Sequence, residues 1–216
     1  MRPVFFKSMI DDFIQQLAAA KETANAFNPY AHGSSTNDAR RHNLHLYLSQ
    51  MAQRQPRCLL VGEAPGYRGG RLTGIPFVSP FILQNGTGKA LLGDWRGYQP
   101  ADEWLAISKE ATATIVWETL VGLPQLPLLW NVFPFHPHKP GSVQSNRAPT
   151  KQEIEMGRPF LYRLLAIYPI KTIIAVGAKA DTALTTWDIP HHKVRHPAHG
   201  GKTAFQSGIK ALVSNF

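Results

Sequence analysis

The chain has 216 residues, of which 44% are hydrophobic and 17% charged, enough apolar material for a compact domain of ordinary size. This composition excludes a wholly disordered chain, and 17 glycines and 17 prolines without a strict period exclude a collagen-like repeat. Lysine and arginine outnumber aspartate and glutamate by 23 to 14, and the net charge of +9 favours a polyanionic partner.

The single cysteine, Cys58, excludes an intrachain disulfide, a four-cysteine iron–sulfur cluster and a cysteine-rich zinc site. The first residues carry charges at Lys7, Asp11 and Asp12 and lack the apolar core of a signal peptide. No apolar run reaches the roughly 20 residues needed to cross a bilayer. We therefore expect a soluble, cytoplasmic monomer with no membrane partner and with neither metal nor cofactor.

Apolar side chains recur at helical spacing in the first part of the chain. Phe13 and Leu17 belong to a pattern that predicts a helix at the N-terminus, and a similar pattern predicts a second helix over 38–53. We expect these helices to form the N-terminal part, 1–56, of a single domain that spans the whole chain. The remainder, 57–216, contains the motifs.

Short apolar runs alternate with helical patterns in this second part. The runs predict buried strands at 58–61, 128–133, 172–176 and 193–195. The helical patterns cover 102–120, 150–168, 178–187 and 203–213. Thr150 stands three residues before Glu153, which is the spacing of a capping box. Alternation of this kind predicts an α/β fold, a three-layer α/β/α sandwich around a parallel sheet.

Polar residues mark the ends of three predicted strands, where open parallel sheets bind their ligands. Glu63 follows the first strand, Asn131 interrupts the second and His196 follows the last. The turn Gly62-Glu63-Ala64-Pro65-Gly66 allows backbone N–H groups to approach a ligand oxygen closely. An ordinary strand-to-loop turn, with the carboxylate in solvent, also fits this pattern.

Three side chains have both a functional and a purely structural interpretation. The Phe77 ring can stack on a nucleobase or belong to the core. The Asn131 amide can pair with a planar ligand edge through one donor and one acceptor, or bond a neighbouring loop. The His196 imidazole can donate to a developing oxyanion, or be an ordinary buried histidine.

Six parts of the sequence resemble, in their order along the chain, the motifs of the uracil-DNA glycosylase superfamily. They are 61–66, 74–78, Asn131, 135–137, 176–180 and 196–197. The similarity is greatest to branches whose first motif reads Gly-Glu-Ala/Gly-Pro-Gly, and this chain lacks the cysteines of the iron–sulfur branches. The resemblance implies a four-stranded parallel sheet between helices.

The resemblance also implies an activity and a role for each matched residue. The enzyme would hydrolyse the N-glycosidic bond of a uracil flipped out of single- or double-stranded DNA, leaving an abasic site and free uracil. The turn Gly62 to Gly66 would bind the base and position the water. Phe77 would stack on the base, Asn131 would read its Watson–Crick edge and His196 would bond the uracil O2.

The sequence departs from the family pattern at three positions. Ala64 stands where some branches have a water-activating aspartate, so Glu63 is the candidate to hold the water. Ala198 replaces a serine found in many relatives. Gly66 stands where another branch has a bulkier residue that excludes thymine, and Tyr67 is a candidate to replace it.

Basic side chains in or beside the motif loops predict a rim that faces the phosphates of DNA. These residues are Arg68, Arg71, Lys139, Arg147, Arg195, His199 and Lys202. Dispersed surface charge is the alternative. Two other functions remain open: a non-catalytic damaged-DNA-binding module on the same fold, suggested by Ala64, and a metal-dependent hydrolase that uses some of the nine histidines.

Overall fold

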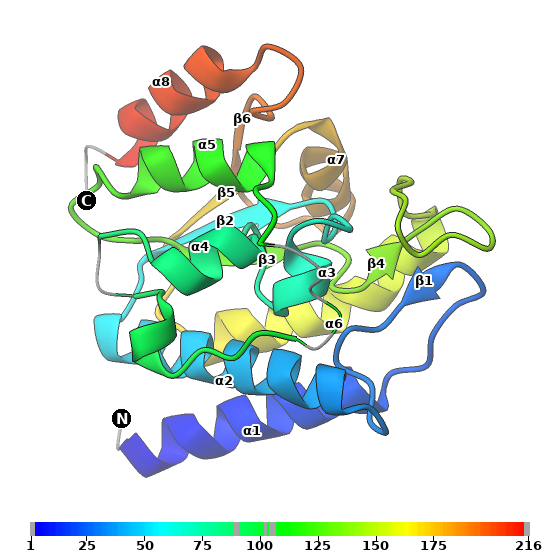
Figure 1. The fold of residues 1–216 in the computed structure, drawn as a ribbon. Helices are drawn as coiled ribbons and strands as arrows, with labels where there is room; N and C mark the ends of the chain where they lie inside the picture. The colour runs from blue at the N-terminus through cyan, green and yellow to red at the C-terminus, as the bar shows by residue number, and fades with distance from the viewer. Residues whose placement is uncertain (1–2, 89–90, 102, 104–106, 214–216) are drawn as a thin grey trace.

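The computed structural model describes residues 3–88, 91–101, 103 and 107–213, and Figure 1 shows the order of its elements. The helices are α1 (Pro3–Ala19), α2 (Ser35–Arg54), α3 (Gly70–Thr73), α4 (Pro80–Asn85), the 3-10 helix η1 (Asp94–Arg96), α5 (Ala111–Leu120), α6 (Lys151–Ile167), α7 (Ala178–Thr186) and α8 (Lys202–Val213). The strands are β1 (Ala26–Phe27), β2 (Cys58–Gly62), β3 (Leu128–Asn131), β4 (His136–Pro137), β5 (Thr172–Val176) and β6 (His192–Val194).

A four-stranded parallel sheet with the order β3-β2-β5-β6 lies at the centre of the molecule. The connections from β2 to β3 and from β3 to β5 run in opposite directions across the sheet, so helices cover both faces. The predicted α/β/α sandwich with a four-stranded parallel sheet is confirmed. The register pairs Gly62 with Asn131, which brings the ends of β2 and β3 side by side.

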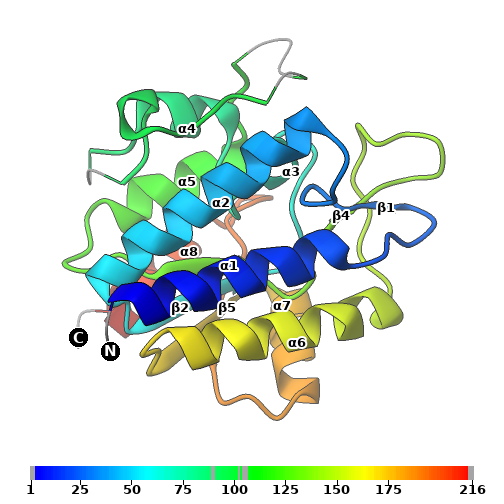
Figure 2. The same cartoon turned by 90° about the horizontal axis from the view of Figure 1, so that it is seen from below.

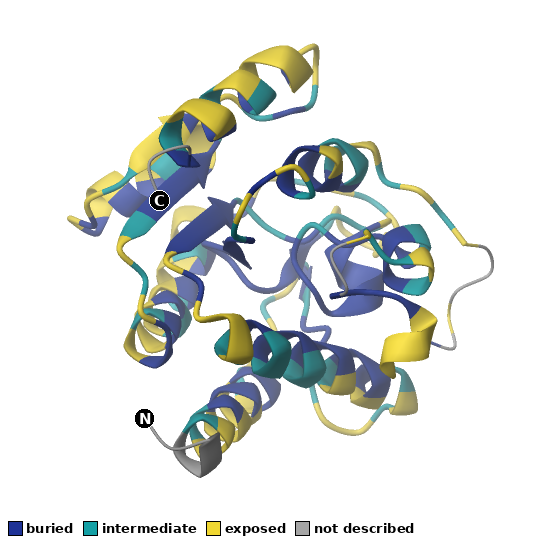
Figure 3. Cartoon of the chain, turned by 90° about the vertical axis from the view of Figure 1, so that its left-hand side faces the viewer, coloured by how far each residue is buried: buried dark blue, intermediate teal, exposed yellow. Residues whose placement is uncertain are grey.

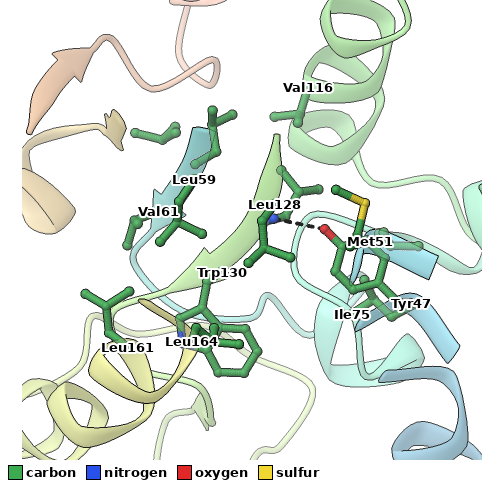
Figure 4. Close-up of a cluster of buried hydrophobic side chains, with 14 of the residues drawn as sticks. Tyr47, Met51, Leu59, Val61, Ile75, Val116, Leu128, Trp130, Leu161 and Leu164 are labelled. Atoms are coloured by element: carbon green, nitrogen blue, oxygen red, sulfur yellow. Dashed lines mark hydrogen bonds between the residues drawn. The ribbon is translucent and has the colours of Figure 1, made fainter. Parts of the chain in front are cut away.

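Figures 1 and 2 show α1 and α6 on one side of the sheet and α5 and α8 on the other. Trp130 of β3 packs beside Leu161 and Leu164 of α6 (Figure 4), and its ring centroid lies 5.3 Å from that of Phe13 in α1. Burial of side chains of this size contributes roughly 1.5–3 kcal/mol each. Figure 3 shows the buried strands and the exposed outer faces of the helices. No described helix is both long and apolar enough to cross a membrane.

Helix α2 covers the edge of the sheet that β3 forms. The hydroxyl of Tyr47 accepts a 2.9 Å hydrogen bond from the backbone N–H of Leu129 (Figure 4). Both residues are fully buried. Because β3 pairs with β2 alone within the sheet, this hydroxyl satisfies a donor that would otherwise be buried without a partner.

The structure corrects one predicted helix and adds a small sheet. The helix predicted over 102–120 begins only at Ala111, because Glu110 has the extended backbone of a residue that precedes a helix. Trp104 and Leu105, which were part of that pattern, lie outside the described residues. Strands β1 and β4 pair antiparallel over two residues each, too short for a sequence pattern to reveal.

The capping box predicted at the start of α6 is confirmed, and it belongs to a larger network around Glu153. Burial alone would raise the pKa of this carboxyl. Hydrogen bonds from Arg147, from the Thr150 backbone and from Thr23 outweigh burial and lower the pKa to about 2. The resulting stabilisation is present above the ordinary pKa of about 4.3 and is lost as the pH falls towards 2.

We therefore expect Glu153→Gln to lower the free energy of unfolding by about 2 kcal/mol at pH 7, the usual value of hydrogen bonds to a charged group. Urea unfolding at pH 7 and pH 3 measures this difference, which should shrink at the lower pH. Asp12→Asn, on the exposed side of α1, serves as the control. Equal stability of Glu153→Gln and wild type at pH 7 would contradict the assignment.

Candidate active site

A cavity of about 240 Å³ lies where β2, β3 and β6 end. Its lining residues are Glu63, Ala64, Pro65, Gly66, Gly69, Gly70, Phe77, Glu110, Thr112, Asn131, Pro137, Asn146, Arg147 and His196. The predicted ring, amide and imidazole therefore line one common space, although they lie in segments far apart in the sequence. The cavity is partly open and its wall combines apolar and polar groups, as in many small-molecule sites.

Phe77 is held in an unusual backbone conformation. Its φ angle of 57° lies in the left-handed region, which a bulky residue rarely adopts without support from its surroundings. Its carbonyl accepts a 3.0 Å hydrogen bond from the indole N–H of Trp117 in α5. The bond from α5 therefore supports the backbone conformation from which the ring reaches the cavity wall.

Gly62 allows this ring and the Asn131 amide to lie directly against the backbone of β2. A Cβ atom on Gly62 would be 2.4 Å from Cζ of Phe77 and 2.7 Å from Oδ1 of Asn131. Both distances are shorter than the contacts that real Cβ atoms make. The site therefore requires a residue without a side chain at position 62, because any Cβ atom would collide with the ring and the amide.

The side chain of Asn131 is only 3% exposed, yet its amide has no hydrogen-bond partner among the residues that the structure describes. Buried amides normally have such partners. Here the open donor and acceptor lie at the cavity wall, where a ligand or water can meet them. The structural interpretation, an amide that bonds a neighbouring loop, does not apply to the described part of the chain.

His196 is positioned by the turn that follows it. Its Nδ1 accepts a 3.1 Å hydrogen bond from the backbone N–H of Ala198, so the neutral ring carries its proton on Nε2. Burial lowers the pKa of His196, the negative charge of Glu110 raises it, and the nearby His199 and Arg195 lower it further. The net result is a neutral imidazole near pH 7, whose Nε2–H donor has no partner among the residues that the structure describes.

Two carboxylates line the cavity. Burial raises the pKa of Glu63, which the charge of Lys179 partly opposes, and its Oε1 is buried without a partner among the described residues. Glu110 was not among the predicted site residues, because the sequence pattern placed it inside a helix. The signal that could have found it is its position directly before the first apolar turn of α5.

Buried His136 joins two loops at the cavity. Its Nδ1 lies 2.7 Å from the carbonyl oxygen of Pro65 and its Nε2 lies 2.9 Å from that of Val143. The backbone N–H of Tyr67 donates to Oδ1 of Asn146, which adds a second link between the same loops. Tyr67 is not one of the residues that line the cavity, although it adjoins Gly66, which does.

Two arginines of the predicted rim have partners within the protein. Arg71 is 4% exposed and its guanidinium pairs with Glu103 at 2.9 Å. Arg147 lines the cavity, but its N–H groups bond Glu153, His138 and other acceptors, so that all five donors are used.

The other predicted rim residues differ in their surroundings. Lys202 is half exposed and pairs with Glu118 at 2.7 Å. Four side chains are exposed: Arg68, Lys139, Arg195 and His199. The guanidinium of Arg68 lies over the ring of Tyr67, 5.3 Å from its centroid, at the edge of the turn that lines the cavity.

A family model of the uracil DNA glycosylase superfamily matches residues 49–212. The chain belongs to this superfamily. The predicted family is thus confirmed, and membership supports the assignment of the chain as a DNA glycosylase, a hydrolase that acts on DNA. The crystal structure of wild-type Pedobacter heparinus SMUG2 has a similar fold, with a TM-score of 0.65 and 17% identity over 96% of each chain. No curated protein sequence matches this superfamily member significantly.

A metal-dependent hydrolase would need a cluster of ligating side chains. Across 3–88, 91–101, 103 and 107–213, no three His, Cys, Asp or Glu side chains are grouped closely enough to hold a metal ion. His191, one of the nine histidines, pairs with Asp181 at 3.2 Å and with the carbonyl of Ile189.

Proposed function

We propose that this superfamily member removes uracil from DNA by hydrolysis of its N-glycosidic bond. The observation that supports this proposal most strongly is the single cavity that Phe77, Asn131 and His196 share. A planar base that enters it meets an aromatic ring, an open amide and an imidazole N–H donor. Each of these groups has a defined use in recognising and releasing a pyrimidine.

Recognition begins with a base outside the duplex, because its sugar carbon is inaccessible inside the stack. Flipping costs a few kcal/mol, and stacking on Phe77 offsets about 1–3 kcal/mol of it. The Asn131 amide accepts from the uracil N3–H and donates to its O4. Cytosine presents the opposite pattern, which leaves buried polar groups unpaired and disfavours its binding.

Bond cleavage places the electrons of the glycosidic bond on the base. The Nε2–H of His196 donates to the uracil O2 as negative charge develops there, an effect of about 2.7–4 kcal/mol on the barrier at comparable oxyanion sites. Water held by Glu63 then adds to the sugar carbon, with loss of its proton, and gives the abasic site. Burial raises the pKa of Glu63 above its ordinary value, which makes the carboxylate a better acceptor for this proton.

DNA is held in this proposal by exposed basic side chains in or beside the motif loops, Arg68, Lys139 and His199. Each phosphate contact releases counterions, so binding should weaken as the salt concentration rises. A binding isotherm that does not change between 50 and 200 mM salt, roughly the range over which such contacts respond, would remove these residues from the interface.

The test of the function uses purified protein and oligonucleotides that contain one uracil, single-stranded or paired. The reaction contains EDTA and is followed by alkali, which cleaves the strand at abasic sites. We expect cleavage at the uracil position and none in a thymine control. Absence of cleavage from both substrates would contradict the proposal, and tight binding without release would favour the non-catalytic module that Ala64 suggests.

A further inference from the structure

A second carboxylate faces the base cavity from a part of the chain that none of the recognised motifs covers. Glu110 lines the cavity together with Glu63 and His196. Its side chain also lies beside the turn that follows the first motif, since a Cβ atom on Gly69 would be 3.7 Å from its Oε2. The carboxylate thus stands between the base-binding turn and the start of α5.

Helix capping accounts for the position of Glu110 but does not require its residue type. Its Oε1 accepts from the N–H of Thr112 at 2.9 Å and its Oε2 from that of Ala113 at 2.7 Å. Serine, threonine, asparagine and aspartate are the preferred residues at such positions, and they satisfy the same donors with a shorter side chain. Glu110 also places a full negative charge at the cavity wall, which helix capping alone does not require.

The negative charge of Glu110 acts on the imidazole of His196, the histidine of the proposed reaction. Among the charged groups that act on the His196 imidazole, Glu110 has the largest effect on its pKa, and it alone raises the pKa. In the proposed reaction, His196 contacts the base oxygen adjacent to the nitrogen that leaves the sugar. A charge close to His196 within the same cavity is therefore close to the bond that breaks.

On the basis of the proposed function, we propose that Glu110 is a second catalytic carboxylate, whose negative charge faces the sugar and stabilises the positive charge that develops on it. The electron pair of the glycosidic bond leaves with the base, water supplies the new oxygen, and Glu110 neither gains nor loses a proton. The two backbone N–H bonds hold its oxygens in place before the reaction, so that little reorganisation is needed.

The decisive variant is Glu110→Ser, because serine is among the best N-cap residues but has no charge. We expect it to fold with wild-type stability and to lower the single-turnover rate at saturating enzyme by about 10²-fold, the usual effect of one preorganised electrostatic group. Glu110→Gln, which keeps the length, should be similarly slow. Glu118→Gln removes a charge from the same helix at a residue outside the cavity lining, and should react at the wild-type rate.

A second measurement does not depend on which base is released. Removal of the Glu110 charge should lower the pKa of His196, which NMR titration of the imidazole in the free protein reports directly. An unchanged pKa in Glu110→Ser overturns the assignment. So does excision by Glu110→Ser at the wild-type rate, whereas a wild-type protein that releases no uracil contradicts the proposed function itself.

Discussion

Replacement of Gly62 by alanine is expected to lower kcat/KM for uracil excision by about 10³-fold or more. The added Cβ would lie 2.4 Å from the Phe77 ring and 2.7 Å from the Asn131 oxygen, so both groups must move. Misplacement of one reacting or positioning group by about 1 Å already costs roughly 10²-fold in rate. Here one methyl group displaces the stacking ring and the recognition amide together.

Neither of the two side chains that the new Cβ would contact can move away without a cost in free energy. Phe77 is fixed by its left-handed backbone and by the Trp117 hydrogen bond, and Asn131 ends a buried strand. The measurement is a single-turnover assay on a uracil oligonucleotide, with circular dichroism to verify the fold. Gly122→Ala is the matched control, since its new Cβ would meet nothing closer than 3.6 Å. Near wild-type excision by Gly62→Ala would show that ring and amide do not act as one recognition surface.

Replacement of His196 by alanine is expected to have the second large effect on uracil excision. We expect kcat to fall by about 10²–10³-fold, because the variant loses a preorganised donor to the oxygen on which charge develops. KM should change much less, since the interaction strengthens only as the bond breaks. His191→Ala, which alters a histidine paired with Asp181, is the control and should retain full activity.

The pH behaviour of His196 gives a further check on this role. Burial lowers its pKa from the ordinary value near 6.5, so the neutral ring persists at pH 6.5 and is protonated only in more acidic solution. Protonation would occupy the Nδ1 lone pair that accepts from Ala198 and so disturb the position of the ring, and activity should therefore be retained at pH 6.5 and decline below it. An imidazole that titrates above pH 6.5 by NMR would be incompatible with the neutral donor that we assign.

The parts of the site that the sequence predicted share one physical origin. Parallel strands end at the same edge of a sheet, so polar residues that follow separate strands converge there even when they are distant in sequence. Glu63, Asn131 and His196 were predicted on this basis, and they line one cavity. The capping box of Thr150 and Glu153 was predictable because its hydrogen bonds are local.

The features that the sequence missed depend on partners that are far away along the chain. Arg71 and Arg147 resemble surface cations in the sequence, but Glu103 and Glu153 occupy their donors in the fold. Glu110 was assigned to a helix because charged residues are common on helices, and only the backbone geometry shows that the helix starts after it. The orientation of Phe77 depends on Trp117, which no periodicity relates to it.

The buried Oε1 of Glu63, which has no hydrogen-bond partner among the described residues, has a cost for the folded protein. A buried polar group without a partner destabilises a fold by roughly 1–3 kcal/mol, a considerable share of the 5–15 kcal/mol that usually separates folded from unfolded protein. A carboxylate oxygen kept open towards the cavity thus lowers the resistance of the protein to unfolding. An apolar residue of similar size at position 63 is therefore expected to resist unfolding better and, on the proposed mechanism, to lose the group that holds the water, so stability and activity make opposite demands at the end of β2.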